Sequence, residues 1–117
     1  MARIDKVVQI VRGNAGTAFA ADGIPKGVAF GAGGSVVPSG TADADGILIV
    51  NKNRGPYGTA VPAGERVDVL VQGEVVEFGG TAGDTVYAGA AGALTTTNTG
   101  KKVGKVLDGG QRLVVNM

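Results

Sequence analysis

The sequence predicts an all-β fold: a small single-domain β-barrel or sandwich with an extended N-terminal arm and Gly-rich loops. Glycine occurs 22 times in 117 residues, nearly three times its usual share of roughly 7%. Glycine and proline recur so often that no helix of ordinary length fits after residue 12. Short β-branched runs stand between them, which is typical of strands joined by tight turns. The length suits one domain with a modest core.

The first 24 residues are expected to form the arm, and residues 25–117 the β-domain. Apolar residues recur at helical spacing between Ile4 and Val11, yet five of those eight residues are β-branched. Because β-branched residues favour extended backbone, we expect a strand or an extended arm over Ile4–Val11. After it, residues 13–34 are rich in Gly and Ala and are expected to be a loop. An Asp-Gly turn is expected at residues 22–23.

Short apolar or β-branched runs predict most of the remaining strands. They are Val36-Val37, Ile47–Val50, Thr85–Ala88, Ala93–Thr96, Val103–Leu107 and Arg112–Asn116. Asp108-Gly109-Gly110 is a good turn sequence between the last two, and Asp45-Gly46 marks a turn before the second. Residues 51–64 are expected to be a loop, because Pro56 and Pro62 interrupt any hydrogen-bond ladder.

The clearest hairpin is predicted over Arg66–Phe78. Valine alternates with other residues before Gln72-Gly73, and a second apolar run follows this dipeptide, so the chain is expected to turn there. A two-residue loop would set Asp68 opposite Glu77, two like charges. A longer loop therefore stays open as an alternative.

The composition predicts a chain that depends on contacts with other chains. Glycine in a strand interior costs roughly 0.5–1 kcal/mol relative to alanine, and aromatic residues make up only 4% of the sequence. A chain this short, Gly-rich and poor in rings should be marginally stable alone. We therefore expect contacts between subunits, or with a host surface, to supply stability.

Charge and missing residue types exclude several functional classes. The net charge of +1 argues against a nucleic-acid binder. The absence of cysteine excludes disulfides and thiolate metal sites, and no apolar run reaches the roughly 20 residues of a membrane span. The N-terminus lacks the pattern of a secretory signal. Without histidine, neither Ser35 nor Ser39 can belong to a serine triad, and we expect no enzyme and no cofactor.

The remaining motifs favour structural interpretations. Asp43-Ala44-Asp45-Gly46 begins like a calcium loop, but a strand follows where further ligands are needed. Gly31-Ala32-Gly33-Gly34-Ser35 lacks the spacing of a phosphate-binding loop, and Gly100-Lys101-Lys102 lacks that of a P-loop. Glu74 and Glu77 are three apart in a predicted strand, so they face opposite sides and do not suit a glycosidase pair.

The C-terminal half, roughly residues 60–117, contains six sequence pieces in a characteristic order. They are Ala63-Gly64-Glu65-Arg66-Val67-Asp68-Val69, Gly73-Glu74-Val75-Val76-Glu77, Ala82-Gly83-Asp84-Thr85-Val86-Tyr87-Ala88, Gly92-Ala93-Leu94-Thr95, Val103-Gly104-Lys105-Val106-Leu107 and Arg112-Leu113-Val114-Val115. In the order of these pieces, this half resembles a family of tailed-phage capsid decoration (cement) proteins. The N-terminal half is similar only in being extended and rich in Gly and Ala.

This resemblance implies a compact β-barrel-like domain, commonly trimeric, without catalytic residues. It would be made in the bacterial host cytoplasm, add to the outer surface of the assembled head, and bridge subunits of the major capsid protein. By analogy with the family's N-terminal arm, Arg3, Lys6 and Arg12 would contact the capsid; a solvated tail is the alternative. Tyr57, Phe78 and Tyr87 are the residues we expect at the oligomer interface.

Two other binding functions remain as alternatives. A carbohydrate-binding or fibre-associated β-domain would need exposed rings, and the chain has no Trp and only Tyr57 and Tyr87 as tyrosines. A swinging-arm carrier would present a modified lysine, Lys101 or Lys102, but the hydrophobic neighbours usual in such carriers are missing.

Overall fold

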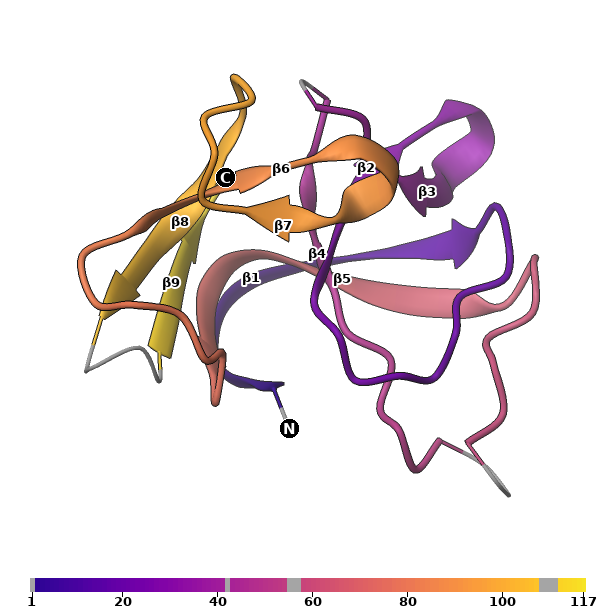
Figure 1. Ribbon diagram of the computed structural model, residues 1–117. Coiled ribbons are helices and arrows are strands. Elements are labelled where there is room, and N and C mark those ends of the chain that lie inside the picture. The colour runs from indigo at the N-terminus through magenta and orange to yellow at the C-terminus, as the bar shows by residue number, and fades with distance from the viewer. Residues whose placement is uncertain (1, 42, 55–57, 108–111) are drawn as a thin grey trace.

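In the computed structural model, which describes residues 2–41, 43–54, 58–107 and 112–117, the chain folds into one nine-stranded sheet (Figure 1). The predicted all-β, single-domain class is confirmed. The strands are β1 (Arg3–Ala15), β2 (Lys26–Phe30), β3 (Ser35–Pro38), β4 (Gly46–Leu48), β5 (Arg66–Val76), β6 (Thr85–Ala88), β7 (Leu94–Thr95), β8 (Lys102–Leu107) and β9 (Arg112–Asn116). The described helical segments are two short 3-10 turns, so none of them has the length or hydropathy of a membrane-spanning helix.

The order of strands in the sheet is β1-β3-β2-β4-β5-β9-β8-β6-β7, and β1 also pairs with β5. The first five strands of that order therefore form a closed ring. The pairings of the ring are antiparallel except between β1 and β3, which pair in parallel at Asn14↔Ser35 and Ala15↔Val36. The longest ladder joins β1 to β5, and Figure 1 shows these two strands curving together across the molecule.

The hairpin predicted over Arg66–Phe78 is wrong, because this segment is a single long strand. β5 runs without a turn through Gln72-Gly73, and Gly73 pairs with β1 on one side and with β9 on the other. A Cβ atom at Gly73 would overlap the carbonyl oxygen of Lys6. This glycine permits a close approach of two backbones, which the sequence pattern does not distinguish from a turn.

Other predicted elements agree better with the structure. The strands over Thr85–Ala88 and Arg112–Asn116 have the predicted bounds, and β1 confirms the extended interpretation of Ile4–Val11. The expected loop over residues 13–34 is wrong in part, since residues 26–30 form β2 in the ring. The predicted turn Asp108-Gly109-Gly110 lies outside the described residues.

The buried side chains form two separate clusters on the two halves of β5. The ring cluster contains Phe19 and small aliphatic residues from the ring strands and the 50–61 region. The second cluster lies against the other half of the sheet. Its fully buried members with the largest side chains are Ile47, Leu70, Val75, Val86, Val103, Val106, Leu113 and Val115. Val67 and Val69 belong to the first cluster and Leu70 and Val75 to the second, so β5 contributes to both cores.

The 3-10 turns η1 (Ala32–Gly34) and η2 (Ala90–Gly92) connect β2 to β3 and β6 to β7 with nearly the same backbone. Their preceding glycines have φ/ψ of −101/−171° and −105/−174°. The middle residues are Gly33 at 70/15° and Ala91 at 56/28°, and each turn ends on a glycine with φ near 80°. Positive φ suits glycine but strains alanine. Ala91 therefore occupies a position that Gly33 fills without strain.

We expect Ala91→Gly to raise the free energy of unfolding by about 0.5–1 kcal/mol, because relief of the left-handed strain exceeds the added entropy of the unfolded chain. The matched change Gly33→Ala should lower it by a similar amount, since a Cβ there meets nothing within 4 Å and adds only strain. Chemical denaturation of the three proteins measures both effects. If both substitutions changed the free energy of unfolding in the same direction, the two loops would not be equivalent.

Candidate functional site

The three predicted capsid-contact residues lie along β1, but they differ in their surroundings. Arg3 Nη1 lies 2.9 Å from Glu77 Oε2, and Arg12 Nε donates to Asp68 Oδ1 at 2.8 Å. Both arginine side chains are 59% exposed. Lys6 is exposed and forms no ion pair with any residue that the structure describes. Among these three residues, Lys6 therefore offers the least compensated charge.

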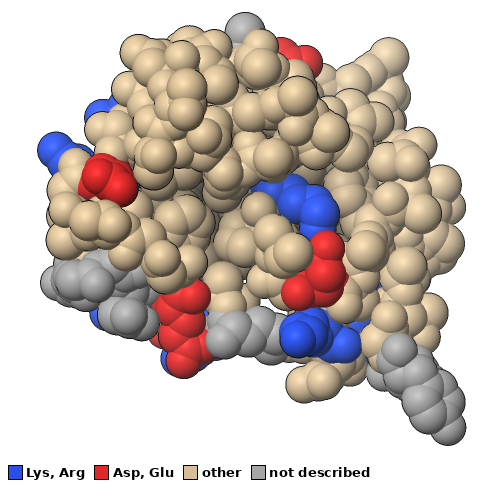
Figure 2. All heavy atoms as spheres, viewed as in Figure 1, with Lys and Arg blue, Asp and Glu red and all other residues tan. Residues whose placement is uncertain are grey.

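Carboxylates that lie near β1 are also paired within the chain. Asp5 Oδ2 lies 3.7 Å from Arg112 Nη1, and the same guanidinium nitrogen donates to Glu74 Oε1 at 2.7 Å. Glu74 stands opposite Lys6 in the β1–β5 register. The basic residues of the arm are neutralised in part by other carboxylates, since Arg3 pairs with Glu77 and Arg12 with Asp68. On the face that Figure 2 shows, charged side chains are scattered over a mostly uncharged surface.

The most exposed large apolar side chains near these charges also come from β1. Val7, Val8 and Ile10 are 50%, 63% and 38% exposed. The sequence interpretation of this segment named only its basic residues as contacts and did not consider its apolar side chains. The signal was available in Val7-Val8, since adjacent strand residues point to opposite faces and at most one of them faces a core. We call the exposed side chains of Lys6, Val7, Val8 and Ile10 together the β1 surface; Lys6 and Val8 line the cleft described next, and Val7 does not.

A shallow cleft of about 190 Å³ opens beside the β1 surface. It is lined by Lys6, Val8, Gln72, Gly73, Glu74, Val114, Val115 and Asn116, from β1, β5 and β9. The walls combine valine side chains with one lysine, one carboxylate and two amides. Such a lining suits an extended stretch of protein better than a small charged ligand, because its one lysine and one carboxylate leave the cleft with no net charge.

A second cleft of about 270 Å³ lies where β4 separates from β5. Its lining is Leu48, Ile49, Val50, Asn51, Arg54, Val61, Val67 and Asp68. Arg54 has a structural role there: Nη1 donates to the carbonyl oxygens of Thr59 and Ala60 at 3.0 Å, and Nη2 bonds Glu65. Through these hydrogen bonds Arg54 connects the two sides of the described part of the 51–64 loop.

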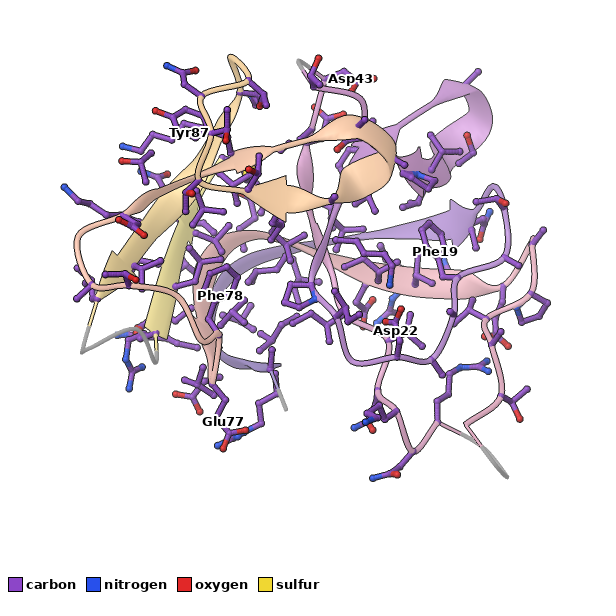
Figure 3. All side chains as sticks on the ribbon, viewed as in Figure 1. Phe19, Asp22, Asp43, Glu77, Phe78 and Tyr87 are labelled. Atoms are coloured by element: carbon purple, nitrogen blue, oxygen red, sulfur yellow. The ribbon has the colours of Figure 1, made fainter. Side chains whose placement is uncertain are left out.

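Of the residues expected at an oligomer interface, the structure describes Phe78 and Tyr87, and these two side chains do not lie together. Phe78 is half-buried and packs against the second core cluster of its own chain, and Tyr87 is half-buried on β6. Figure 3 labels both rings, and they lie well apart. Tyr57 lies outside the described residues. Phe78 therefore contributes to the core of its own chain.

The carboxylates of the acidic motif at residues 43–45 accept hydrogen bonds from backbone N–H groups of the same chain. Asp43 Oδ1 accepts the N–H of Gly40 at 2.5 Å, and Asp45 Oδ2 accepts the N–H of Phe30 at 2.9 Å. The two carboxylates thus hold different segments. Among the described residues, no group of three or more acidic side chains is arranged to hold a metal ion.

Asp22 and Lys26 form the best-connected ion pair near the ring. Lys26 Nζ lies 2.8 and 2.9 Å from the two Asp22 oxygens, and the Ile24 N–H donates to Oδ1 at 3.0 Å. Partial burial raises the pKa of Asp22, but these hydrogen bonds together lower it more. Its pKa therefore lies below the ordinary 3.8. Figure 3 shows Asp22 on the loop that precedes β2.

Comparison with known proteins finds a likeness in structure alone. No protein-family model and no curated protein sequence matches the chain. A solved structure of a protein chain from Mycobacterium phage Patience has the same fold, with a TM-score of 0.81. The likeness covers 98% of this chain and 95% of the phage chain, at 16% sequence identity. The two chains therefore share one complete architecture, with little left over on either side.

We expect Asp22→Asn to lower the free energy of unfolding by about 0.5 kcal/mol near neutral pH, because the pair with Lys26 is partly exposed and screened. A depressed folded-state pKa means that the carboxylate stabilises the fold above about pH 3.8 and loses this effect as the pH falls through the lower folded value. The difference between variant and wild type should therefore disappear in acid. Denaturation curves at several pH values measure it.

The control for this prediction is Asp84→Asn, since Asp84 forms no ion pair with a described residue. It should change stability less than Asp22→Asn near neutral pH. A destabilisation by Asp22→Asn that persists unchanged in acid would show that the charge of Asp22 is not its cause.

Proposed function

We propose that this protein is a structural virion protein of a tailed phage, which binds the outer surface of the capsid. In this proposal it stabilises the assembled head by bridging subunits of the major capsid protein. It is not an enzyme, needs no cofactor, and acts as a homo-oligomer, with a trimer favoured. The observation that carries the proposal is the end-to-end fold likeness to a phage protein chain, which covers nearly all of both chains.

The ordered motifs of the C-terminal half support the same proposal from the sequence. The pieces that resemble capsid decoration proteins contribute to β5, β6, β7, β8 and β9. These strands provide most of the second core cluster, which also contains Ala2, Ala44 and Ile47 from the first half of the chain. The resemblance therefore covers neighbouring strands of the sheet and not a set of scattered loops.

The surface of the chain also suits binding to protein. Its net charge is +1, several charges near β1 are compensated within the chain, and the β1 surface adds exposed apolar side chains beside a shallow cleft. Protein interfaces need such apolar area together with a polar rim. A lattice of many copies makes weak individual contacts effective, because they act together.

The direct test mixes purified protein with undecorated heads assembled from the major capsid protein encoded in the same genome, followed by cryo-electron microscopy. We expect stoichiometric density at fixed positions of the lattice on the outer surface. Decorated heads should also survive heating to a higher temperature than bare heads, since a bound partner stabilises the assembled state. Heads that stay bare at saturating protein would contradict the proposal.

Within this proposal, Lys6 is the basic residue expected to contribute most to capsid binding. Lys6→Glu should weaken binding to heads about tenfold, which corresponds to roughly 1.4 kcal/mol. Lys105→Glu, which changes an exposed lysine on β8, is the matched control and should stay within about twofold of wild type. Sedimentation of heads with labelled protein measures both affinities. Equal losses in the two variants would indicate a general effect of charge and exclude a specific role of Lys6.

A further inference from the structure

The two halves of β1 belong to different parts of the fold. Residues 10–15 pair with the first half of β5 and end at Ala15, which is buried in the ring cluster. Residues 3–8, which we call the N-terminal half-strand, pair with the second half of β5. There Ile4 packs against the second core cluster, next to the buried Ala2. Each half is thus anchored by its own core.

Between these two anchors, β1 pairs with β5 through an irregular ladder and buries no side chain. All six residues from Asp5 to Ile10 are exposed. The ladder with β5 shifts register three times in this region, between Ile4 and Lys6, between Val7 and Gln9, and between Gln9 and Ile10. A strand with no buried face has little to fix its register, and such strands are prone to alternative pairing. The middle of β1 therefore has the properties of a hinge.

The place that the N-terminal half-strand occupies is shaped for its own sequence. Gly73 lets the carbonyl oxygen of Lys6 approach the β5 backbone, where any side chain would collide with it. Glu77 pairs with Arg3 at 2.9 Å, and Arg112 pairs with Asp5 at 3.7 Å. An unrelated strand could still bring its backbone close to Gly73 but would lose both ion pairs, whereas the same segment of another copy would keep all of these contacts.

We propose that the N-terminal half-strand exchanges between copies of this chain, so that residues 3–8 of one copy occupy the place on β5 of a second copy. The hinge lies at Val8 and Gln9, where two of the register shifts occur. Exchange preserves the ladder, both ion pairs and the packing of Ile4, so its free-energy difference from the closed chain is small. This inference concerns contacts between copies and holds whether or not the larger partner is a capsid.

The natural absence of cysteine makes the exchange directly testable. Lys6 and Glu74 are opposite each other in the β1–β5 register, and such Cα pairs lie about 4.5–5.5 Å apart, within the range of a disulfide. Chains with Lys6→Cys and chains with Glu74→Cys, of which one carries a tag, are mixed at high concentration, incubated and oxidised. We expect the disulfide between the two variants to exceed either same-variant disulfide at least about fivefold on a non-reducing gel.

The matched control mixes Arg12→Cys chains with Asp68→Cys chains. These positions are also register partners, and their side chains meet in the structure, but they belong to the half of β1 that stays in its own ring. The yield of the disulfide between these two variants should not exceed the yield of disulfides between identical variants. If the Lys6→Cys and Glu74→Cys mixture gives no more product than this control, the exchange does not occur.

A chain carrying both Lys6→Cys and Glu74→Cys provides a second readout. Oxidation at high dilution closes the disulfide within one chain and locks the half-strand onto its own β5. Sedimentation should then show the mass of a single chain at all concentrations, while the reduced form of the same variant associates as concentration rises. Far-UV circular dichroism checks that both forms are folded. A locked form that associates as readily as the reduced one would overturn the proposal.

Head binding is measured separately, so the capsid proposal can fail or succeed independently of the exchange.

Discussion

The continuity of β5 is the constraint on which the rest of the structure depends. Its first half provides Val67 and Val69 to the ring cluster, and its second half provides Val75 to the other cluster. Between them, Gly73 lies between the backbones of β1 and β9 without a side chain. A turn at this point would separate the chain into two small units with too little buried area each. One uninterrupted strand instead joins two modest cores into a single sheet, which compensates for the scarcity of aromatic residues.

The properties of β1 follow from its position against this strand. It pairs with β5 along nearly its whole length, yet its middle contacts neither core. Charges there are largely compensated within the chain, and valine side chains are exposed instead. Bulges at Asp5 and Val8 and the charge of Lys6 also make the outer edge of β1 a poor template for indiscriminate strand pairing. In the proposed function this surface binds a specific protein partner, and these features oppose indiscriminate pairing of strands.

Much of the fold could be predicted from the sequence, and the errors have physical causes. The short apolar runs, separated by frequent glycines and prolines, identified the all-β class and located β6, β8 and β9 closely. Gln72-Gly73 was misinterpreted because glycine serves both turns and close backbone contacts, and only long-range pairing distinguishes them. β2 was missed because Ala and Gly dominate its surroundings. For the candidate site, the basic residues could be named, but their intrachain carboxylate partners at Asp68 and Glu77 depend on tertiary structure.

The pairing of β1 with β5 also has a consequence for biosynthesis. The ribosome releases residues 3–15 before residues 66–76, so most of β1 waits for its main partner strand, and only Asn14 and Ala15 can pair earlier, with β3. The ring cannot close until the fifth strand emerges, and contacts between distant parts of a sequence form slowly. During that interval the nascent N-terminus displays Val7 and Val8 to other nascent chains on the same messenger. Neighbouring ribosomes could thus supply the first opportunity for one copy to meet another.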